Sequence, residues 1–439
     1  MSIEVFNRTP KTIDGVDIFI KQENIDNYIS ESYYILSRHY QYLCQVNNLF
    51  SIDSIERKEY FNLLHNAFSH NLKILKEIMN SLENQIKLDS FANTSTNSNN
   101  KTSEVLLKDY HYIQRDWCSP HKKSQIDSVV DAIRTELNNV SIAKENALFL
   151  GAGTGRFVFE IADIFDKSYA TDKSFSMVWH TKKLMEGREI DFYKPILKNV
   201  LNLNKVAKKF SAYIPSKYRK LNDKVSYFVS DVLDLPLNEN SLSVVFSIYF
   251  TDVIALKLWF NKINLLVQPK GLFVHFGPLD YFFTDPNEML TAEEFKSFFE
   301  SNGYKTITDT VIETPHIEDS NSMSYKVYRN WFFIAQKNEI EELQINDNTV
   351  LSIKKPLSYE RKGVIKEGEK ETEVNLELPK GTFNGASSVV QILKLVDGQN
   401  TFNEIIEQLK MNGFAINNSD EIKNLLLDFL SQGILSIED

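Results

Sequence analysis

The segment that most constrains the fold is ALFLGAGTGRFVFEIADIF, residues 147–165. It begins as a short apolar strand, meets three glycines at two-residue spacing (Gly151, Gly153 and Gly155), and continues in a helical pattern. The chain has only 15 glycines in 439 residues, so three within five positions indicate a backbone requirement. Glycine adopts positive φ readily and leaves space above the backbone. The segment therefore predicts a tight strand-to-helix turn that a ligand can approach closely, the alternative being the same turn without a ligand.

Two carboxylates follow at the ends of the next predicted strands. Asp172 stands 17 residues after Gly155, at the end of KSYATD, where a carboxylate can accept both hydroxyl groups of a ribose. It could also cap a helix that begins in DKSFSM, and the two roles are compatible. Asp231 follows the third strand, VSYFVS, where a side chain could reach an adenine amino group. A pyrophosphate-binding loop would have its third glycine where Arg156 stands.

The chain divides into three regions by composition. Residues 1–105 read as helices, with an Asn/Ser/Thr-rich loop at 89–104 that lacks the apolar residues needed to order it. Residues 106–340 contain apolar runs that alternate with helical patterns, which predicts an α/β fold with a parallel sheet. Residues 350–439 read as short strands and three amphipathic helices, after the polar segment KNEIEELQINDNT.

The order of motifs in the central region resembles the class I S-adenosylmethionine (SAM)-dependent methyltransferases. LPLNENSLSVVFS leads into a fourth strand, and INLLVQPKGLFVHFGP supplies a helix, a turn and a fifth strand. The resemblance implies a Rossmann-like sheet and SAM as the cofactor.

Several longer stretches resemble the carnosine N-methyltransferase family. They are YIQRDWCSPHKKSQID, DFYKPILKNVLNL, YFTDVIALKLWFNKI, HFGPLDYFF and SMSYKVYRNWFFIAQK. The resemblance implies that SAM is held by the glycine loop with Arg156, Asp172 and Asp231, and that Asp252 faces the substrate.

Further catalytic candidates follow from the same resemblance. Tyr281 and Tyr328 match tyrosines near the substrate. The sequence departs from the family at Phe282, where the family has histidine, and at Asp280, where it has leucine. The substrate pocket is therefore expected to differ from one that holds carnosine.

Methyl transfer from a sulfonium needs little acid–base catalysis, because the donor is already activated and positioning supplies much of the acceleration. Asp252 could orient an acceptor ring and stabilise its developing positive charge, or it could cap the helix over VIALKLWFNKI. Asp280 could be a turn residue and Tyr328 a core aromatic. His275 reads as a packed histidine rather than a catalytic base. The histidines show no metal-ligand spacing, so no metal site is predicted.

The C-terminal region resembles PqqD-like peptide-recognition domains in ILKLVDGQNTFNEII and FLSQGIL. Such domains capture a leader peptide by adding it as a strand to a small sheet. The alternative is a generic winged helix that packs or mediates a homodimer. DNA binding is disfavoured, because NSDEIKNLLLDFLSQGILSIED is acidic where a recognition element would be basic.

The overall composition bears on the partners and the cellular location of the protein. The formal net charge of −10 disfavours nucleic acid as a partner. The two cysteines, the absence of a signal pattern and the absence of a membrane-length apolar run predict a cytoplasmic protein. The leading hypothesis is a SAM-dependent N-methyltransferase acting on a peptide, with an imidazole nitrogen as acceptor. The alternatives are methylation of a histidine-containing dipeptide such as carnosine and a catalytically silent peptide-binding adaptor.

Overall fold

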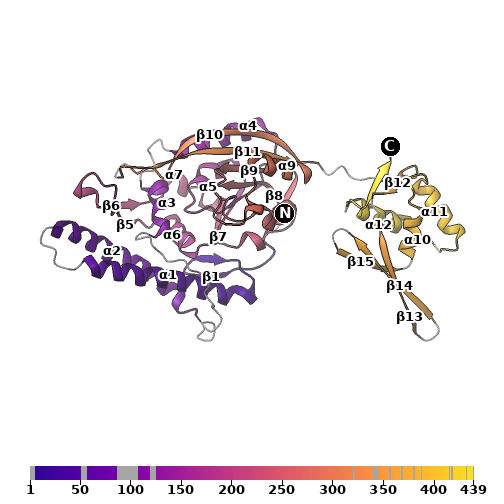
Figure 1. The fold of residues 1–439 in the computed structure, drawn as a ribbon, viewed down its shortest axis with the longest axis horizontal. Helices are drawn as coiled ribbons and strands as arrows, with labels where there is room; N and C mark the ends of the chain where they lie inside the picture. The colour runs from indigo at the N-terminus through magenta and orange to yellow at the C-terminus, as the bar shows by residue number, and fades with distance from the viewer. Residues whose placement is uncertain are drawn as a thin grey trace. The chain divides into compact units, whose positions relative to one another are not determined.

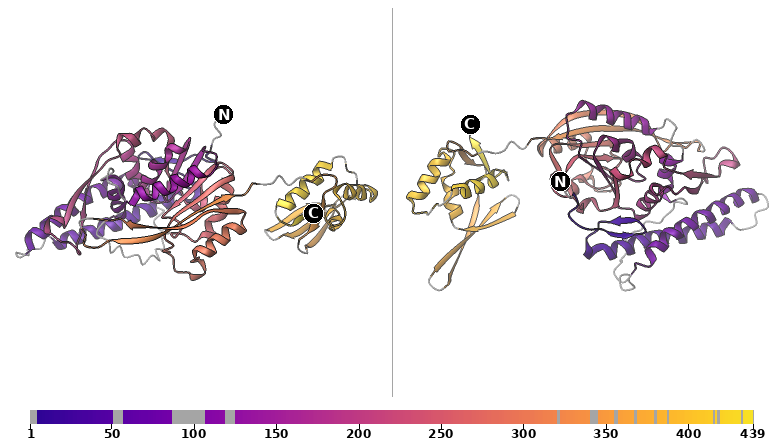
Figure 2. Two further views of the ribbon diagram at one scale, coloured as in Figure 1. Left: turned by 90° about the horizontal axis from the view of Figure 1, so that it is seen from above. Right: turned by 180° about the vertical axis from the view of Figure 1, so that it is seen from behind.

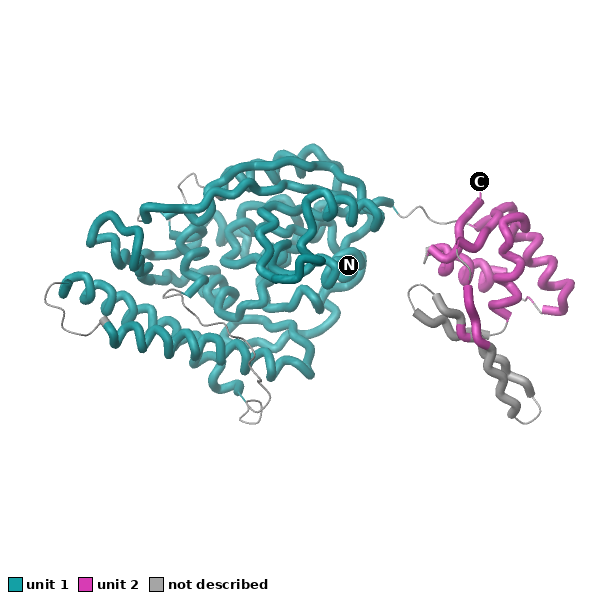
Figure 3. Tube along the Cα trace, in the orientation of Figure 1, with its two compact units in different colours: residues 1–339 teal, residues 340–439 magenta. Residues whose placement is uncertain are grey.

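The computed structural model describes two compact units, residues 1–339 and 340–439 (Figure 3). The described residues are 5–50, 57–86, 107–118, 125–319, 322–339, 345–354, 357–366, 369–378, 381–386, 388–414, 416, 419–431 and 433–438. The predicted loop at 89–104 and residues 340–344 of the polar segment lie outside them. In the described part of the chain, no helix has both the length and the apolar character required to cross a membrane.

Unit 1 is built on a nine-stranded sheet in the order β1-β2-β7-β4-β3-β8-β9-β11-β10 (Figure 1). Strands β2 to β9 of this order are parallel neighbours, and β11 runs antiparallel between β9 and β10. The bounds are β1 (Lys11–Ile13), β2 (Val16–Ile18), β3 (Asn146–Leu150), β4 (Lys167–Asp172), β7 (Val225–Val229), β8 (Leu242–Ile248), β9 (Val267–Gly277), β10 (Tyr304–His316) and β11 (Lys326–Lys337). All seven residues of β8 are buried, as expected for a central parallel strand covered on both faces.

Helices cover both faces of the sheet (Figures 1 and 2). Successive side chains of β3 enter different cores: Ala147 and Phe149 pack with helices α1 to α6, whereas Leu148 and Leu150 pack with α8 and α9. The bounds are α1 (Gln22–Phe50), α2 (Lys58–Glu83), α3 (Lys108–Trp117), α4 (Gln125–Asn139), α5 (Arg156–Ile161), α6 (Phe175–Met185), α7 (Ser216–Arg219), α8 (Leu256–Leu266) and α9 (Ala292–Ser301). The helices predicted for residues 1–105 thus share the core of the sheet.

Two features of unit 1 go beyond the repeating strand–helix pattern. Strands β1 and β2 extend the sheet, because Ile18 pairs with Val229 of β7. A two-stranded insertion, β5 (Ile190–Pro195) and β6 (Ala207–Ala212), lies between α6 and β7. It is attached to α2, where the Asn71 side chain donates to the Tyr193 carbonyl at 2.7 Å and accepts from the Tyr193 N–H at 2.9 Å.

Unit 2 has a small hydrophobic core of its own, contributed by its helices, by β12 and by β16. Its elements are β12 (Val350–Ile353), β13 (Ser358–Lys366), β14 (Glu369–Leu378), β15 (Gly381–Ala386), α10 (Ser388–Leu395), α11 (Phe402–Met411), α12 (Ser419–Ser431) and β16 (Leu435–Glu438). β12 pairs with β16, and β13-β14-β15 form a separate antiparallel sheet. The predicted fold class is confirmed: a class I methyltransferase strand order, N-terminal helices, and a small C-terminal unit of strands and helices.

Candidate active site

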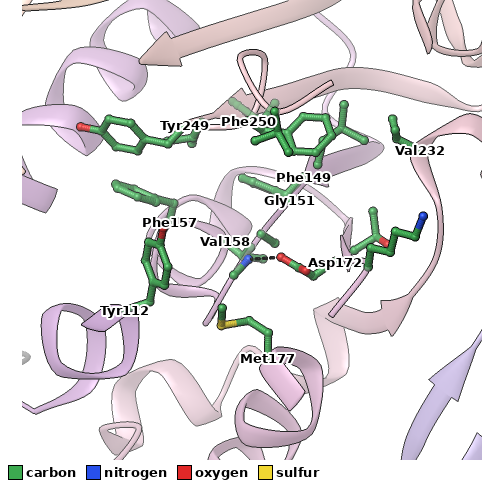
Figure 4. A pocket seen from close by; sticks show the side chains of 18 of the residues that line it. Tyr112, Phe149, Gly151, Phe157, Val158, Asp172, Met177, Val232, Tyr249 and Phe250 are labelled. Atoms are coloured by element: carbon green, nitrogen blue, oxygen red, sulfur yellow. Dashed lines mark hydrogen bonds between the residues drawn. The ribbon is translucent and has the colours of Figure 1, made fainter. Parts of the chain in front are cut away.

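A cavity of about 280 Å³ lies where strands β3, β4, β7 and β8 end. This is the edge of an open α/β sheet at which ligands bind, because the loops after parallel strands converge there. Figure 4 shows Tyr112, Phe157 and Tyr249 on one side of the cavity and Val232 on the other. Four predicted cofactor residues line this cavity: Gly151, Gly153, Asp172 and Asp231.

The backbone conformation of this loop requires glycine at three positions. Gly151, Gly153 and Gly155 have φ of +54°, +59° and +85°. A Cβ on Gly151 would lie 2.3 Å from Cδ2 of Phe250, so any side chain here would force the Phe250 ring to move. Gly155 is the N-cap of α5 and does not line the cavity, and a Cβ there would lie 3.2 Å from the Tyr227 ring. Gly151 and Gly153 therefore form part of the cavity wall. Gly155 instead allows the turn to pack closely against Tyr227 of β7.

Asp172 ends β4 with its carboxylate held by two backbone groups. The N–H of Gly153 donates to Oδ2 at 3.0 Å, and the N–H of Ser174 donates to Oδ1 at 2.9 Å. The N-cap of α6 is Ser174, so Asp172 supports the start of this helix without being its cap. Burial raises the pKa of Asp172 to about 6, against the lowering effect of these hydrogen bonds. Each oxygen keeps a lone pair for a further donor, as binding of two ribose hydroxyls requires.

Asp231 lies two residues after the end of β7 and lines the cavity. Its Oδ1 accepts from the N–H of Leu233 at 2.9 Å, and its Oδ2 pairs with Lys173 Nζ at 2.8 Å. The Lys173 side chain is 61% exposed, so solvent weakens this pair. The Asp231 carboxylate is therefore available to a competing donor such as an adenine amino group.

Arg156 does not line the cavity. Its Nη1 donates to the Asp116 carbonyl at 2.8 Å, and its Nη2 pairs with Glu160 at 2.7 Å. The guanidinium also lies over the Trp117 ring, 5.4 Å from its centre. These contacts join α5 to α3. Binding of SAM by Arg156 stays a prediction.

Arg115, in the R-D-W stretch, is a cavity residue that was not predicted from the sequence. Arg115 lines the cavity, and its Nε and Nη2 donate to the two carboxylate oxygens of Asp116 at 2.5 and 3.1 Å. The Thr154 hydroxyl of the glycine loop donates to the same carboxylate, and Trp117 Nε1 donates to the Thr154 carbonyl. This bidentate pair fixes a cation at the cavity, where it can hold the carboxylate of an amino-acid ligand.

The predicted catalytic residues form a second group beyond β8. Asp252 is only 4% exposed, and burial, reinforced by the nearby Asp280 carboxylate, raises its pKa to about 6. The backbone of Asp280 partly offsets this rise, and the N–H of Phe282 donates to the Asp252 carbonyl at 3.0 Å. Tyr328 in turn donates to Oδ2 of Asp280 at 3.4 Å. The structure therefore brings Asp252, Asp280 and Tyr328 together.

Other predicted residues have different surroundings. The N-cap of α8 is Ala255, so the alternative reading of Asp252 as this cap is wrong. The Tyr281 hydroxyl donates to the Leu290 carbonyl at 2.7 Å, and Phe282 is 74% exposed. His275 is fully buried between the Thr251 hydroxyl and the Gly277 carbonyl, and burial lowers its pKa to about 4, which agrees with a packed histidine.

The chain matches the model of a known protein family. The family model "Carnosine N-methyltransferase" matches residues 91–339, more than half of the chain. The chain belongs to the carnosine N-methyltransferase family. It is thus a SAM-dependent methyltransferase, as predicted, and SAM is its methyl donor. The comparison with curated proteins gives no match.

Solved structures resemble the chain only distantly. The YcgJ protein from Bacillus subtilis is 12% identical, with a TM-score of 0.32, and the similarity covers 49% of this chain and 98% of that one. A SAM-dependent methyltransferase from Leishmania major is 12% identical, with a TM-score of 0.33 and coverage of 48% and 72%. One from Methanosarcina mazei is 11% identical, with a TM-score of 0.31 and coverage of 46% and 97%.

The methyl donor fits the residues that line the cavity. The carboxylate of Asp172 suits a ribose, that of Asp231 suits an adenine amino group, and the Arg115 guanidinium suits an amino-acid carboxylate. Within the described ranges, no group of three or more His, Cys, Asp or Glu side chains could hold a metal ion.

Proposed function

We propose that this member of the family methylates a nitrogen of a peptide substrate, and that the acceptor is a histidine imidazole. The observation that carries the proposal is the group of Asp252, Asp280 and Tyr328, which does not itself line the cofactor cavity but adjoins it through Val253, a lining residue next to Asp252. It offers carboxylates and a phenol to an acceptor that carries an N–H and gains positive charge.

The reaction needs few groups. The lone pair of a neutral imidazole nitrogen attacks the methyl carbon, and the carbon–sulfur bond breaks to give S-adenosylhomocysteine. The positive charge moves to the ring, which then loses its other N–H proton to water. Asp252 accepts a hydrogen bond from that N–H, which orients the ring and stabilises the charge.

The C-terminal unit supports a peptide substrate. In the sheet β13-β14-β15, strands β13 and β15 each have one edge without a partner strand in the sheet. An extended leader peptide can add to such an edge through its main chain. The resemblance to PqqD-like domains supports the same role. Tethering a substrate through its leader raises the local acceptor concentration towards the millimolar range.

A histidine-containing dipeptide is the second candidate, because the matching family is named for carnosine N-methylation. Against carnosine itself stand Phe282, whose ring points largely to solvent, and the added carboxylate of Asp280. A histidine in a longer peptide can be held by contacts elsewhere along that peptide. Its binding therefore depends less on residues that close the pocket around a free dipeptide.

The test compares the full chain with residues 1–339. Both hydrophobic cores of unit 1 consist of residues before 340, and that of unit 2 begins at Ile345, so the shortened chain should fold and bind SAM. Mass spectrometry would measure methyl transfer to carnosine, to a short histidine peptide and to any long histidine-containing precursor peptide that a neighbouring gene encodes. We expect the shortened chain to lose transfer to the long peptide and to keep transfer to a short histidine peptide. Equal activity of both chains on the long peptide would remove the leader role and favour the small-molecule function.

A further inference from the structure

Two loops of unit 1 that are distant in the sequence lie side by side (Figure 1). One connects β5 to β6, and the other connects β10 to β11. Val200 of the first loop pairs with Ser322 of the second in an isolated antiparallel bridge. The N–H of Met323 donates to the Asn199 carbonyl at 2.8 Å, and Asn199 Nδ2 donates to the Ser324 hydroxyl at 3.1 Å. The two loops are therefore joined into one region of the surface.

A buried ion pair fixes this joint. Lys194 of β5 pairs at 2.8 Å with Asp319, which follows β10, and both side chains are largely buried. Lys194 Nζ also donates to Oε1 of Gln114 on α3 at 2.7 Å. Ile317 has a φ of +48°, a left-handed conformation that is rare for a β-branched residue. Because these contacts already order the two loops, a partner that binds them loses little free energy in ordering them.

The joined loops expose five large apolar side chains. Those of Leu201 and Met323 are each 66% exposed. The full set, which we call the loop surface, consists of Leu197, Leu201, Leu203, Met323 and Tyr325. Single exposed apolar residues are ordinary, but a group of them on adjoining segments marks a site for a partner.

The charge around the loop surface is opposite to that of the whole chain. Residues 192–222 contain eight Lys and Arg and no Asp or Glu, whereas the chain has a net charge of −10. Lys198 in this segment is exposed, as is Lys326 at the start of β11. Of the two carboxylates in the β10–β11 connection, Asp319 is held in the buried ion pair and Glu318 is exposed. The loop surface therefore suits a partner that is both apolar and acidic.

We propose that the loop surface binds a segment of the peptide substrate close to its acceptor residue, and that this segment is rich in apolar side chains and in Asp or Glu. The inference deepens the proposed function and rests on its peptide substrate. It assigns to the two loops the selection of the peptide, separately from the residues that handle the acceptor ring.

The location of the loop surface favours a substrate peptide over a membrane as its partner. Tyr325 stands three residues before Tyr328, which belongs to the group proposed to meet the acceptor. Three residues of extended chain span about 10 Å. A peptide whose acceptor lies beside Tyr328 therefore reaches the loop surface within a few residues. Contact with a membrane would make no use of this proximity.

The experiment measures peptide binding separately from methyl transfer. Fluorescence anisotropy would follow three labelled synthetic peptides as they bind the full chain saturated with S-adenosylhomocysteine. The first peptide has a central histidine flanked by alternating leucine and glutamate, and the second has serine and glutamine in their place. The third keeps the leucine–glutamate flanks but has alanine instead of histidine. The first and third should bind at least about fivefold more tightly than the second.

Two substitutions with matched controls locate this binding on the loop surface. Leu201→Ser should weaken binding of the leucine–glutamate peptide about threefold to tenfold, whereas Leu258→Ser on α8, at the same 66% exposure, should leave it unchanged. Lys198→Gln should weaken it by up to about fivefold, and by less at high salt. Lys144→Gln, which removes another exposed lysine, should have no effect. All four side chains are exposed, so these substitutions should not disturb the fold.

Equal affinity of the wild type for the leucine–glutamate and serine–glutamine peptides would overturn the inference, as would equal losses in Leu201→Ser and Leu258→Ser. Binding of the wild type to phosphatidylserine vesicles that Leu201→Ser abolishes would assign the loop surface to a membrane and would also overturn it. Failure of the proposed function has a different signature. The peptide preference and its loss in Leu201→Ser would then remain, yet mass spectrometry would find no methyl group on the histidine peptide.

Discussion

Removing the Asp172 carboxylate should weaken SAM binding by roughly tenfold to a hundredfold. The carboxylate already accepts from the N–H groups of Gly153 and Ser174, which fixes its position at the end of β4. The remaining lone pairs would accept the ribose hydroxyls, and a hydrogen bond to a charged group contributes about 1.5–3 kcal/mol. Asp172→Ala removes this contribution to the free energy of SAM binding.

The pH dependence of the same equilibrium gives a second prediction about Asp172. Its pKa is raised to about 6, so the carboxylate is ionised at pH 8 and mostly protonated at pH 5. Hydroxyl donors favour the ionised form, so SAM affinity should fall by roughly tenfold as the pH drops from 8 to 5. In Asp172→Asn this pH dependence should disappear, because the residue no longer titrates.

Calorimetric titration of SAM at several pH values would test both predictions. The matched control is Asp166→Ala, which removes an exposed carboxylate just before the other end of β4. It should bind SAM as the wild type does. Unchanged affinity in Asp172→Ala would refute the assignment of Asp172 to the ribose, and equal pH dependence in wild type and Asp172→Asn would refute the electrostatic argument.

Three other substitutions test neighbouring parts of the site. Arg115→Gln should weaken SAM by about tenfold or more but leave 5′-methylthioadenosine, which lacks the carboxylate, unaffected, and equal losses for both ligands in calorimetry would contradict the assignment. Gly151→Ala should lower the melting temperature more than Gly153→Ala, because its Cβ would meet Phe250 whereas no atom lies within 4 Å of a Cβ on Gly153. Similar thermal shifts would count against that steric reading. Asp252→Asn should slow methyl transfer roughly tenfold to a hundredfold at saturating SAM without changing SAM affinity, and a wild-type rate would exclude Asp252 from the reaction.

The parts of the fold that rest on local sequence pattern could be predicted. The glycine loop, its strand and its helix lie within 19 consecutive residues, and their periodicity identifies them. Asp172 and Asp231 could be located because Asp172 ends one apolar strand and Asp231 stands two residues after another. Strands β1 and β2 could not, because three-residue strands have no measurable period and exist through pairing with β7.

The missed site residues depend on contacts between distant segments. Arg115 becomes a cavity residue only because α3 packs against the glycine loop through Asp116 and Thr154. Tyr249 lines the cavity with a left-handed backbone, a conformation that no sequence pattern around it indicates. No pattern in either segment alone contains this information. The resemblance to the family suggested the R-D-W stretch without indicating which of its residues faces the cavity.

The charges around the site favour the proposed direction of charge transfer. Methyl transfer moves a positive charge from the donor sulfur to the acceptor nitrogen. On the cofactor side, Arg115 is paired with Asp116 and Lys173 with Asp231. On the proposed acceptor side, the carboxylates of Asp252 and Asp280 lie near each other and Asp280 accepts from Tyr328, so these contacts do not offset their negative charge. This asymmetry stabilises the charge where it arrives, and it should weaken below about pH 6 as Asp252 is protonated.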